Sequence, residues 1–338
     1  MRGVVFTGDR KLEIREFPDP VAGPGEAVIK MGASGICGSD LSPYRAQSAQ
    51  ANISGHEPCG TIAELGPGVV GWKVGDRVMI HHYAGCGTCK YCRIGYEQLC
   101  VHGHEVYGFS AHGGNADYML VPARCLVNLP DELSLAEGAA IACGTGTAYM
   151  ALKKLDVSGR DTLAVYGQGP VGLSATLFGK AMGSRVVAVD VSPARLELAR
   201  ALGADVVLNP NDVDPIQAIR DLTHGEGADA TLDCTGNATA RAQTVRSARV
   251  FGRACFVGEG GTVTLEPSPD IIHRHLTLYG SWTFPNVGIE ECARFVVDRS
   301  VPLARLITHR FRLDQAAEAF QLFDGGASGK CVFVMDDA

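Results

Sequence analysis

The sequence has no excess of positive charge and no long apolar run. Its 30 lysines and arginines are outnumbered by 37 aspartates and glutamates, which gives a formal net charge of −7. Because nucleic-acid-binding surfaces are strongly basic, we expect no nucleic-acid partner. No apolar stretch reaches the length of a membrane-spanning helix, and no charged segment followed by an apolar one opens the chain. We therefore expect no membrane partner and a location in the cytoplasm.

The length and the texture of the chain predict two domains of different kinds. A chain of 338 residues is too long for one ordinary core. Residues 1 to about 130 consist of short apolar runs separated by glycine and proline, which is typical of a β-rich domain. From about residue 145 strands alternate with helices, which predicts a doubly wound parallel sheet. We expect its strands at residues 162–166, 185–190, 206–209, 230–233, 254–257 and 276–279, followed by helices at 289–298 and about 314–323 and a last strand at 330–335.

Four of the twelve cysteines form a closely spaced group. Cys86, Cys89, Cys92 and Cys100 have the spacing Cys-x2-Cys-x2-Cys-x7-Cys, with glycines between them. Four thiolates in so short a loop favour a closed, tetrahedral structural zinc site over disulfides in a chain without an export segment. An iron–sulfur cluster, a zinc ribbon that binds nucleic acid and four unliganded thiols are the alternatives. The last spacing and the acidic composition weigh against the first two. We expect the loss of this metal to destabilise its lobe without affecting the chemistry.

A second set of metal-binding side chains comes earlier in the chain. Cys37 lies in Gly-Ile-Cys-Gly-Ser-Asp, and His56 lies in Gly-His-Glu-Pro-Cys-Gly. A thiolate and an imidazole with nearby carboxylates are the ligands and supporting groups of many zinc sites. A lone histidine is more often a satisfied core residue, so the pair by itself leaves the question open.

A glycine motif predicts a nucleotide site. Gly167, Gly169 and Gly172 form Gly-x-Gly-x-x-Gly directly after an apolar strand and before a helical stretch. Such glycines make a tight turn, let a pyrophosphate approach the backbone and pack the helix on the strand. Asp190 ends the next strand, where a carboxylate accepts hydrogen bonds from the adenosine ribose. Since Val191 follows and no arginine is next to it, the motif favours NAD over NADP.

With these motifs in this order, the chain resembles the zinc-dependent medium-chain alcohol dehydrogenases over essentially its full length. The resemblance implies that Cys143 is the third ligand of a catalytic zinc held by Cys37 and His56, so that each chain binds two zinc ions. It also implies that Glu57 lies beside the metal and that Asp40 orients His56. Ser39 would take the proton of the substrate.

The resemblance further implies the architecture. We expect an α/β protein with a Rossmann doubly wound parallel sheet domain and a β-rich GroES-like catalytic domain. The catalytic, zinc-binding domain would comprise residues 1–144 and 284–338, and the NAD-binding domain residues 145–283. Homodimers or homotetramers are usual in the family, with the last strand of each cofactor sheet pairing across a dimer axis. The expected cofactor-binding residues, besides the three glycines and Asp190, are Thr147, Pro170, Val171, Arg195 and Val257.

The implied reaction is the reversible oxidation of an alcohol to an aldehyde or ketone. Ser42 occupies the position at which many relatives have a proton-relaying histidine, and serine cannot act as a base near neutral pH. His82 is the alternative relay, or it is only a polar wall of the pocket that favours secondary or polar alcohols. Trp282 and Phe284 are candidates for the pocket wall or for the core at the domain junction. A polyol, sugar or amino-alcohol dehydrogenase and a non-catalytic NAD-binding protein are the alternative functions.

Overall fold

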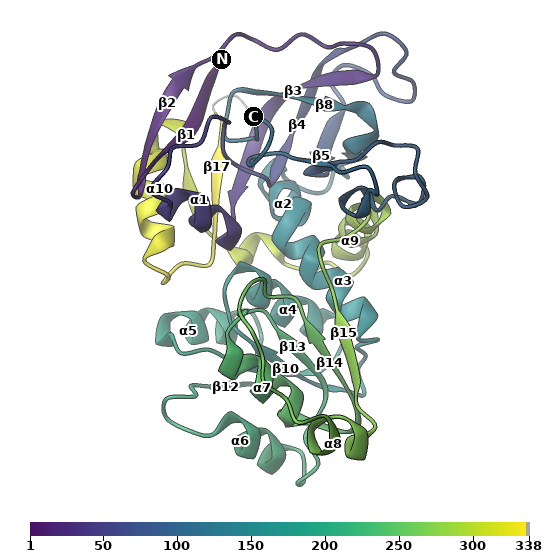
Figure 1. The fold of residues 1–338 in the computed structure, drawn as a ribbon, viewed down its shortest axis with the longest axis vertical. Helices are drawn as coiled ribbons and strands as arrows, with labels where there is room; N and C mark the ends of the chain where they lie inside the picture. Colours follow the sequence, from purple (N-terminus) through teal and green to yellow (C-terminus); the bar gives the residue numbers. More distant parts are fainter. Residues whose placement is uncertain (336–338) are drawn as a thin grey trace. The chain divides into compact units, whose positions relative to one another are not determined.

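The computed structural model describes residues 1–335, which divide into two compact units. The first unit consists of Met1–Gly146 together with the segment from Thr283 onward, and the second is Thr147–Trp282. Each unit is built around its own sheet (Figure 1). The chain therefore leaves the first unit once and returns to it once. Within the described residues, no helix is long and apolar enough to span a membrane.

The first unit is β-rich, and its largest sheet combines strands from both ends of the chain. The closing strand β17 (Lys330–Val334) pairs antiparallel with β3 (Glu26–Ile36) and parallel with β16 (Ile307–Phe311). Side chains from both ends, such as Phe6, Phe320 and Phe333, share one buried core. The other strands of this unit are β4 (Pro58–Leu65), β5 (Arg77–Ile80), β8 (Tyr118–Pro122) and β9 (Leu126–Asn128) in the same sheet, and the pairs β1 (Arg2–Gly8) with β2 (Lys11–Glu16) and β6 (Tyr83–Ala84) with β7 (Glu105–Val106).

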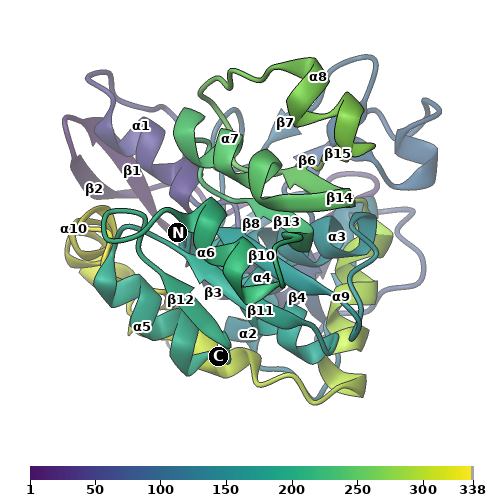
Figure 2. The same cartoon turned by 90° about the horizontal axis from the view of Figure 1, so that it is seen from below.

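The second unit is a parallel sheet of six strands. Their order is β12 (Val206–Leu208), β11 (Arg185–Val189), β10 (Thr162–Tyr166), β13 (Ala228–Asp233), β14 (Ala248–Phe256) and β15 (Thr277–Gly280). Successive side chains of a strand point to opposite faces of the sheet. Because β10 is buried after its first residue, other elements must pack on both of its faces. Ala164 and Tyr166 pack in the cluster that contains Ile219 of α6, whereas Leu163 lies against Gly179 of α4. Helices thus cover both faces (Figure 2), which confirms the predicted Rossmann-type sheet.

The helices have the following bounds. The first unit contains α1 (Leu41–Arg45), α2 (Leu135–Ala140), α9 (Asn286–Asp298) and α10 (Ala316–Asp324). The second contains α4 (Pro170–Ala181), α5 (Pro193–Ala201), α6 (Pro215–Leu222), α7 (Ala238–Ser247) and α8 (Pro267–Asp270), and α3 (Gly146–Lys154) begins at the boundary. All six strands expected in this unit form, as do the two helices and the strand expected after residue 284.

Candidate metal centres and nucleotide loop

Three elements of the first unit bring one buried cluster together. Cys37 follows the last residue of β3, His56 and Glu57 directly precede β4, and Cys143 lies in a π-helical turn, Ile141–Thr145, that follows α2. One possible ligand atom from each of these four side chains lies within 4.8 Å of the other three. All four side chains are buried. The structure therefore places together the residues expected to hold the catalytic metal.

Asp40 fixes the orientation of His56. Its carboxylate lies 2.7 Å from Nδ1 of His56 and accepts a second hydrogen bond, of 2.8 Å, from the backbone N–H of Cys37. With the proton of Nδ1 directed at Asp40, the other ring nitrogen, Nε2, is the one free to bind a metal. Ser39 Oγ lies 3.1 Å from that nitrogen, so its hydroxyl is at the cluster. The 3-10 turn of Gly38–Asp40, with Cys37 as its N-cap, thus supplies a candidate ligand, a hydroxyl and the group that orients a second candidate ligand.

The donor set fits a divalent cation. A hydrogen bond with Cys143 lowers the pKa of Cys37 well below its usual value despite burial, which favours the thiolate form. The same hydrogen bond and burial raise the pKa of Cys143. Burial opposes the charge on His56, but Asp40 and Cys37 outweigh it and raise the pKa of the imidazole. A thiolate, a second sulfur and an oriented imidazole in a dry site are the ligand set of a three-coordinate zinc site with an open position.

Glu57 has a partner that the sequence analysis missed. Its carboxylate is completely buried and forms an ion pair with Lys330, which is also completely buried. Lys330 Nζ also donates a hydrogen bond of 3.1 Å to the carbonyl of Ile36, the residue before Cys37. Burial raises the pKa of Glu57 to about 7, while Lys330 opposes that rise. The sequence did contain a signal for this pair, because Lys330 is the first residue of an apolar strand. Buried lysines are rare unless they are paired, so a lysine at such a position predicts an acidic partner.

His82 lies next to the cluster. Its ring is 5.2 Å from the ring of His56, and its Nδ1 donates a hydrogen bond of 3.3 Å to the carbonyl of Ala142, beside Cys143. Burial, and to a smaller extent the neighbouring imidazoles of His56 and His81, lower its pKa well below the usual value. A neutral ring at this place favours a role for His82 as a polar wall of the pocket over a role as a proton relay.

Two other polar residues lie on α1. Ser42 is exposed, and Arg45 forms an ion pair with Asp324.

The four cysteines of the loop also form a cluster. Their sulfur atoms lie within 4.8 Å of one another, with Cys89 and Cys92 3.5 Å apart. The hydroxyl of Thr88 and the backbone N–H groups of Thr88 and Cys89 donate to Cys86 Sγ, and these bonds lower the pKa of Cys86 to about 5. Four cysteine sulfurs around a common centre, one of them held by backbone N–H groups, fit a closed tetrahedral site.

The glycine loop of the second unit is open where a ligand would approach. Gly167 has a φ of +87°, and a Cβ on Gly172 would lie 1.7 Å from the carbonyl oxygen of Gly167, so neither position admits a side chain. No heavy atom lies within 4 Å of the place where a Cβ on Gly169 would be. Gly169 caps α4, whose first residues are Pro170 and Val171. A helix N-terminus behind an uncovered backbone fits a pyrophosphate.

Asp190 lies beside this loop. Its carboxylate accepts hydrogen bonds from the backbone N–H groups of Gln168, at 2.6 Å, and Ser192, at 2.8 Å. Each carboxylate oxygen keeps a further lone pair for a ribose hydroxyl. Arg195 lies in the first turn of α5 with a buried Nε that has no hydrogen-bond partner among the described residues. Val257 directly follows β14, at the edge of the sheet where the glycine loop follows β10, and Thr147 is buried in the first turn of α3.

Two segments of this chain match models of known protein families. Residues 23–131 match the family model of the alcohol dehydrogenase GroES-like domain, and residues 170–298 match that of the zinc-binding dehydrogenases. The uncharacterised zinc-type alcohol dehydrogenase-like protein YphC of Escherichia coli is 40% identical over 100% of this chain and 99% of that protein. The chain belongs to the zinc-dependent medium-chain alcohol dehydrogenase family.

Two further matches are a sequence relative and a solved structure. The L-threonine 3-dehydrogenase of Pyrococcus horikoshii is 35% identical over 96% of this chain and 95% of that protein. A crystal structure described as an NAD-dependent alcohol dehydrogenase is 29% identical, with a TM-score of 0.87 over 99% of both chains. The fold class, the oxidoreductase activity and the cofactors zinc and NAD expected from the resemblance are thereby confirmed.

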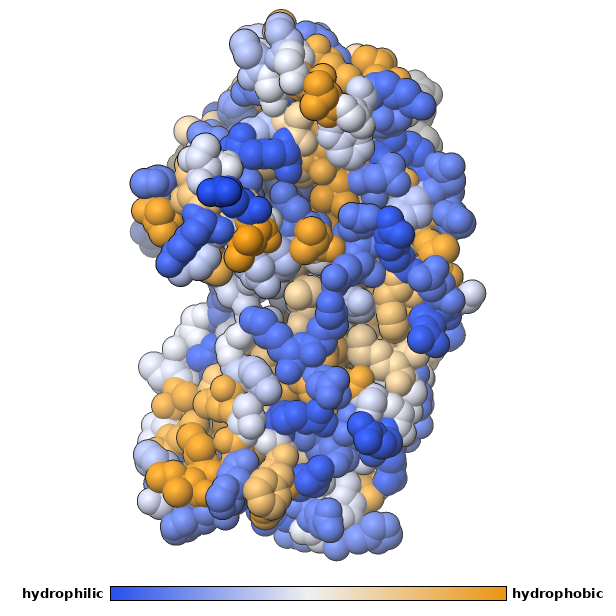
Figure 3. Space-filling view, turned by 90° about the vertical axis from the view of Figure 1, so that its right-hand side faces the viewer, coloured by the Kyte–Doolittle hydropathy of each residue, from blue (hydrophilic) through white to orange (hydrophobic). Residues whose placement is uncertain are grey.

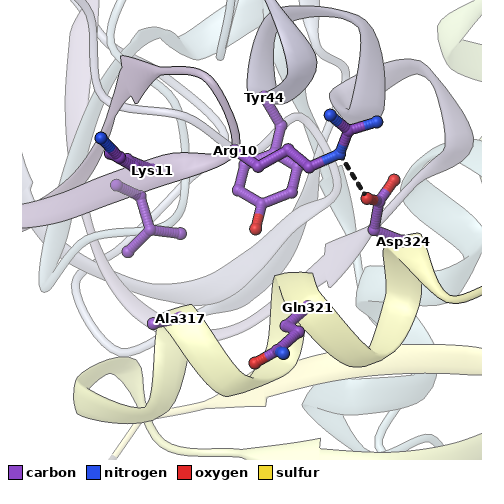
Figure 4. A pocket seen from close by; sticks show the side chains of 7 residues that line it. Arg10, Lys11, Tyr44, Ala317, Gln321 and Asp324 are labelled. Atoms are coloured by element: carbon purple, nitrogen blue, oxygen red, sulfur yellow. Dashed lines mark hydrogen bonds and ion pairs between the residues drawn. The ribbon is translucent and has the colours of Figure 1, made fainter.

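One surface cavity of the first unit is separate from these sites. Figure 4 shows its walls, which come from the turn after β1, from α1 and from α10. Arg10, Tyr44 and Asp324 line it, and Arg10 pairs with Asp324 at 3.0 Å. None of its lining residues belongs to either metal cluster or to the glycine loop.

Proposed function

We propose that this enzyme oxidises a secondary or otherwise polar alcohol to its ketone or aldehyde, with NAD as the acceptor, and catalyses the reverse reaction. The observation that carries the proposal is the buried group of Cys37, His56 and Cys143, in which Asp40 leaves only one nitrogen of His56 free. When bound, zinc supplies a Lewis acid and NAD a hydride acceptor. A non-catalytic NAD-binding protein would have no need to keep these three ligands buried and oriented.

Each side chain has a separate role in this proposal. Ser39 Oγ lies within hydrogen-bond distance of a ligand atom, so its hydroxyl is placed to receive the proton of the alcohol and pass on its own. Asp40 holds the imidazole against rotation. Glu57 and Lys330 form a buried pair beside Cys37, so any negative charge on the carboxylate is offset by that of the ammonium group. His82 contributes a polar wall.

A panel of substrates tests the proposal. A simple secondary alcohol, a polyol, a hydroxy acid and L-threonine are each offered with NAD, and NADH formation is followed by absorbance. L-threonine tests the second candidate, an amino-alcohol dehydrogenase, which is supported by the 35% identity to the L-threonine 3-dehydrogenase. We expect the highest kcat/KM for a short secondary or polar alcohol. The absence of NADH formation with every compound, in protein that holds two zinc ions per chain, contradicts the proposal.

His82 sets the preference for polar alcohols in this proposal. His82→Phe should raise kcat/KM for a longer alkyl alcohol relative to a polar one by about three- to tenfold, because an apolar ring replaces a buried polar one. The dependence of kcat on pH should stay unchanged, since burial keeps His82 neutral near pH 7. Loss of an ionisation from the kcat profile would instead assign His82 to the proton path. If neither quantity changes, His82 does not face the substrate.

Asp190 selects NAD in this proposal. The double variant Asp190→Ser, Val191→Arg removes the ribose acceptor and its repulsion toward a 2′-phosphate and adds a partner for that phosphate. The side chain of Val191 is 59% exposed, so an arginine has room there. We expect the ratio of kcat/KM for NAD to that for NADP to fall by about a hundredfold or more. A change of this size corresponds to roughly two charge-assisted hydrogen bonds lost with NAD or gained with NADP. An unaltered enzyme that prefers NADP contradicts the assignment.

We also propose that the chain is a homodimer or homotetramer located in the cytoplasm. Among residues 1–335, strand β15 pairs with β14 alone and forms an edge of its sheet, and Phe251, Ile272 and Leu278 are exposed in this part of the chain. The face drawn in Figure 3 shows apolar side chains gathered over the second unit. Unpaired edges that carry apolar side chains favour association. None of the twelve cysteines, all of which lie among the described residues, forms a disulfide, and a reducing compartment preserves that state. Light scattering after gel filtration measures the mass; a monomer contradicts the proposal.

A further inference from the structure

The cysteine loop holds the segment by which the chain returns to the first unit. Gln98, two residues before the last cysteine of the cluster, donates a hydrogen bond of 3.0 Å from Nε2 to the carbonyl of Phe284. The backbone N–H of Asn286 donates to Gly95 at 3.0 Å, and its side chain donates to the carbonyl of Arg124 at 2.9 Å. Residues 284–286 are therefore fixed to the loop at two points and to Arg124 at a third.

The same segment touches the histidines beside the catalytic cluster. His81 Nε2 donates a hydrogen bond of 2.9 Å to the Phe284 carbonyl, and its Nδ1 lies 3.1 Å from the carbonyl oxygen and 3.3 Å from the backbone nitrogen of Tyr83. The buried ring of Phe284 lies 5.6 Å from the ring of His81 and 6.2 Å from that of His82. Phe284 is thus a wall behind His82, and the carbonyl of Phe284 is shared by Gln98 and His81.

Two features indicate that this connection is not kept for stability alone. The Oε1 atom of Gln98 is buried without a hydrogen-bond partner among the described residues, which costs free energy that an apolar side chain would not cost. Thr283, the residue before Phe284, has a φ of +48°, an unfavourable conformation for a β-branched residue. Such a conformation persists only where neighbouring contacts impose it, and the hydrogen bonds that fix residues 284–286 begin at the next residue.

We propose that Gln98 is a positioning residue through which the cysteine loop sets the place of Phe284 and hence of the pocket wall at His82. The inference rests on the proposed function for its effect on substrate. The sequence analysis expected the metal of the cysteine cluster to serve stability alone. Under this proposal a change in the cysteine loop also alters substrate binding, because an unbroken series of direct contacts connects the loop to the pocket wall. The path runs from Gln98 to Phe284 and on to His82, whose ring lies beside that of His56.

Gln98→Met tests the proposal, with Leu99→Ala as its matched control. Leu99 lies in the same 3-10 turn, Glu97–Leu99, but its side chain is 43% exposed. In Gln98→Met we expect two zinc ions per chain, a melting temperature within a few degrees of wild type, and kcat/KM for the alcohol lowered about three- to tenfold, mainly through KM. This is the size of one neutral hydrogen bond. Leu99→Ala should change neither kinetic constant. Unchanged kinetics in Gln98→Met overturn the proposal.

A second measurement separates this inference from the proposed function. Trp282 lies two residues before Phe284, and Trp72 is the only other tryptophan of the chain. In a Trp72→Phe background, Gln98→Met should shift or quench the emission of Trp282, whereas Leu99→Ala should leave it unchanged. Asn286→Ala removes another anchor of the same segment and should act in the same direction, even if Gln98→Met fails to accumulate. An emission change without any alcohol oxidation refutes only the proposed function; identical emission in both anchor variants refutes the inference.

Discussion

His56→Ala should remove one of the two bound zinc ions from each chain and lower alcohol oxidation by about a thousandfold or more. Loss of the imidazole leaves two sulfurs and the carboxylate of Glu57, which is already paired with Lys330, and such a set holds zinc poorly. Asp40 then keeps a buried carboxylate that has lost its main partner. Lewis-acid assistance contributes several kcal/mol, and about 4 kcal/mol corresponds to a thousandfold in rate. Zinc per chain is measured by plasma mass spectrometry, and the rate by NADH absorbance.

Cys292→Ala is the control for this variant. Cys292 is also completely buried in the first unit, on α9, but belongs to neither metal cluster. It should retain two zinc ions and the wild-type kcat, with a loss of stability of about 1 kcal/mol from the small cavity. A His56→Ala enzyme that keeps both metal ions and more than a tenth of the wild-type rate would show that the catalytic metal is held elsewhere.

Cys92→Ser should remove the other zinc ion and lower the melting temperature by ten degrees or more, or prevent the protein from accumulating in soluble form. Cys92 is the most buried of the four cysteines of the loop, so no solvent molecule can easily take the place of its sulfur. A structural zinc site is worth about 10 kcal/mol or more in small zinc domains, which is comparable with the whole stability of a typical protein. Zinc analysis and calorimetry measure the two effects.

Thr88→Val separates the loss of a ligand from a general disturbance of the loop. The Thr88 hydroxyl donates a hydrogen bond of 3.4 Å to Cys86 Sγ but is not itself a ligand. Its removal should cost about 1 kcal/mol and leave both zinc ions bound. If Cys92→Ser melted like the wild type with two zinc ions per chain, the cysteine cluster would not be a metal site.

The sequence allowed both metal clusters and the nucleotide loop to be predicted because each depends on spacing that is visible locally. The cysteines of the loop lie within fifteen positions, and the glycine motif lies between a strand and a helix that have clear periodicities. Cys143 is different: nothing around it distinguishes it from a core cysteine, and only the resemblance to a known family singled it out.

The ion pair between Glu57 and Lys330 could not be predicted in this way. It depends on the pairing of β17 with β3, which brings Lys330 to the carbonyl of Ile36 from the far end of the chain. Nothing in either segment alone specifies that register. The sharing of the Phe284 carbonyl between His81 and Gln98 is of the same kind, because it joins three segments that are distant in sequence.

The π-helical turn at Ile141–Thr145 makes the length of this stretch critical. A π-turn contains one residue more than an α-turn, and it lies here between two α-helical segments, Leu135–Ala140 and Gly146–Lys154. Deleting one residue from it would allow an uninterrupted α-helix, but every residue beyond the deletion would turn by about 100° around the axis. Either Cys143 would then point away from Cys37 and His56, or the whole of the following helix would present a different face to its neighbours. We therefore expect that substitutions are tolerated in this stretch far better than any change in its length.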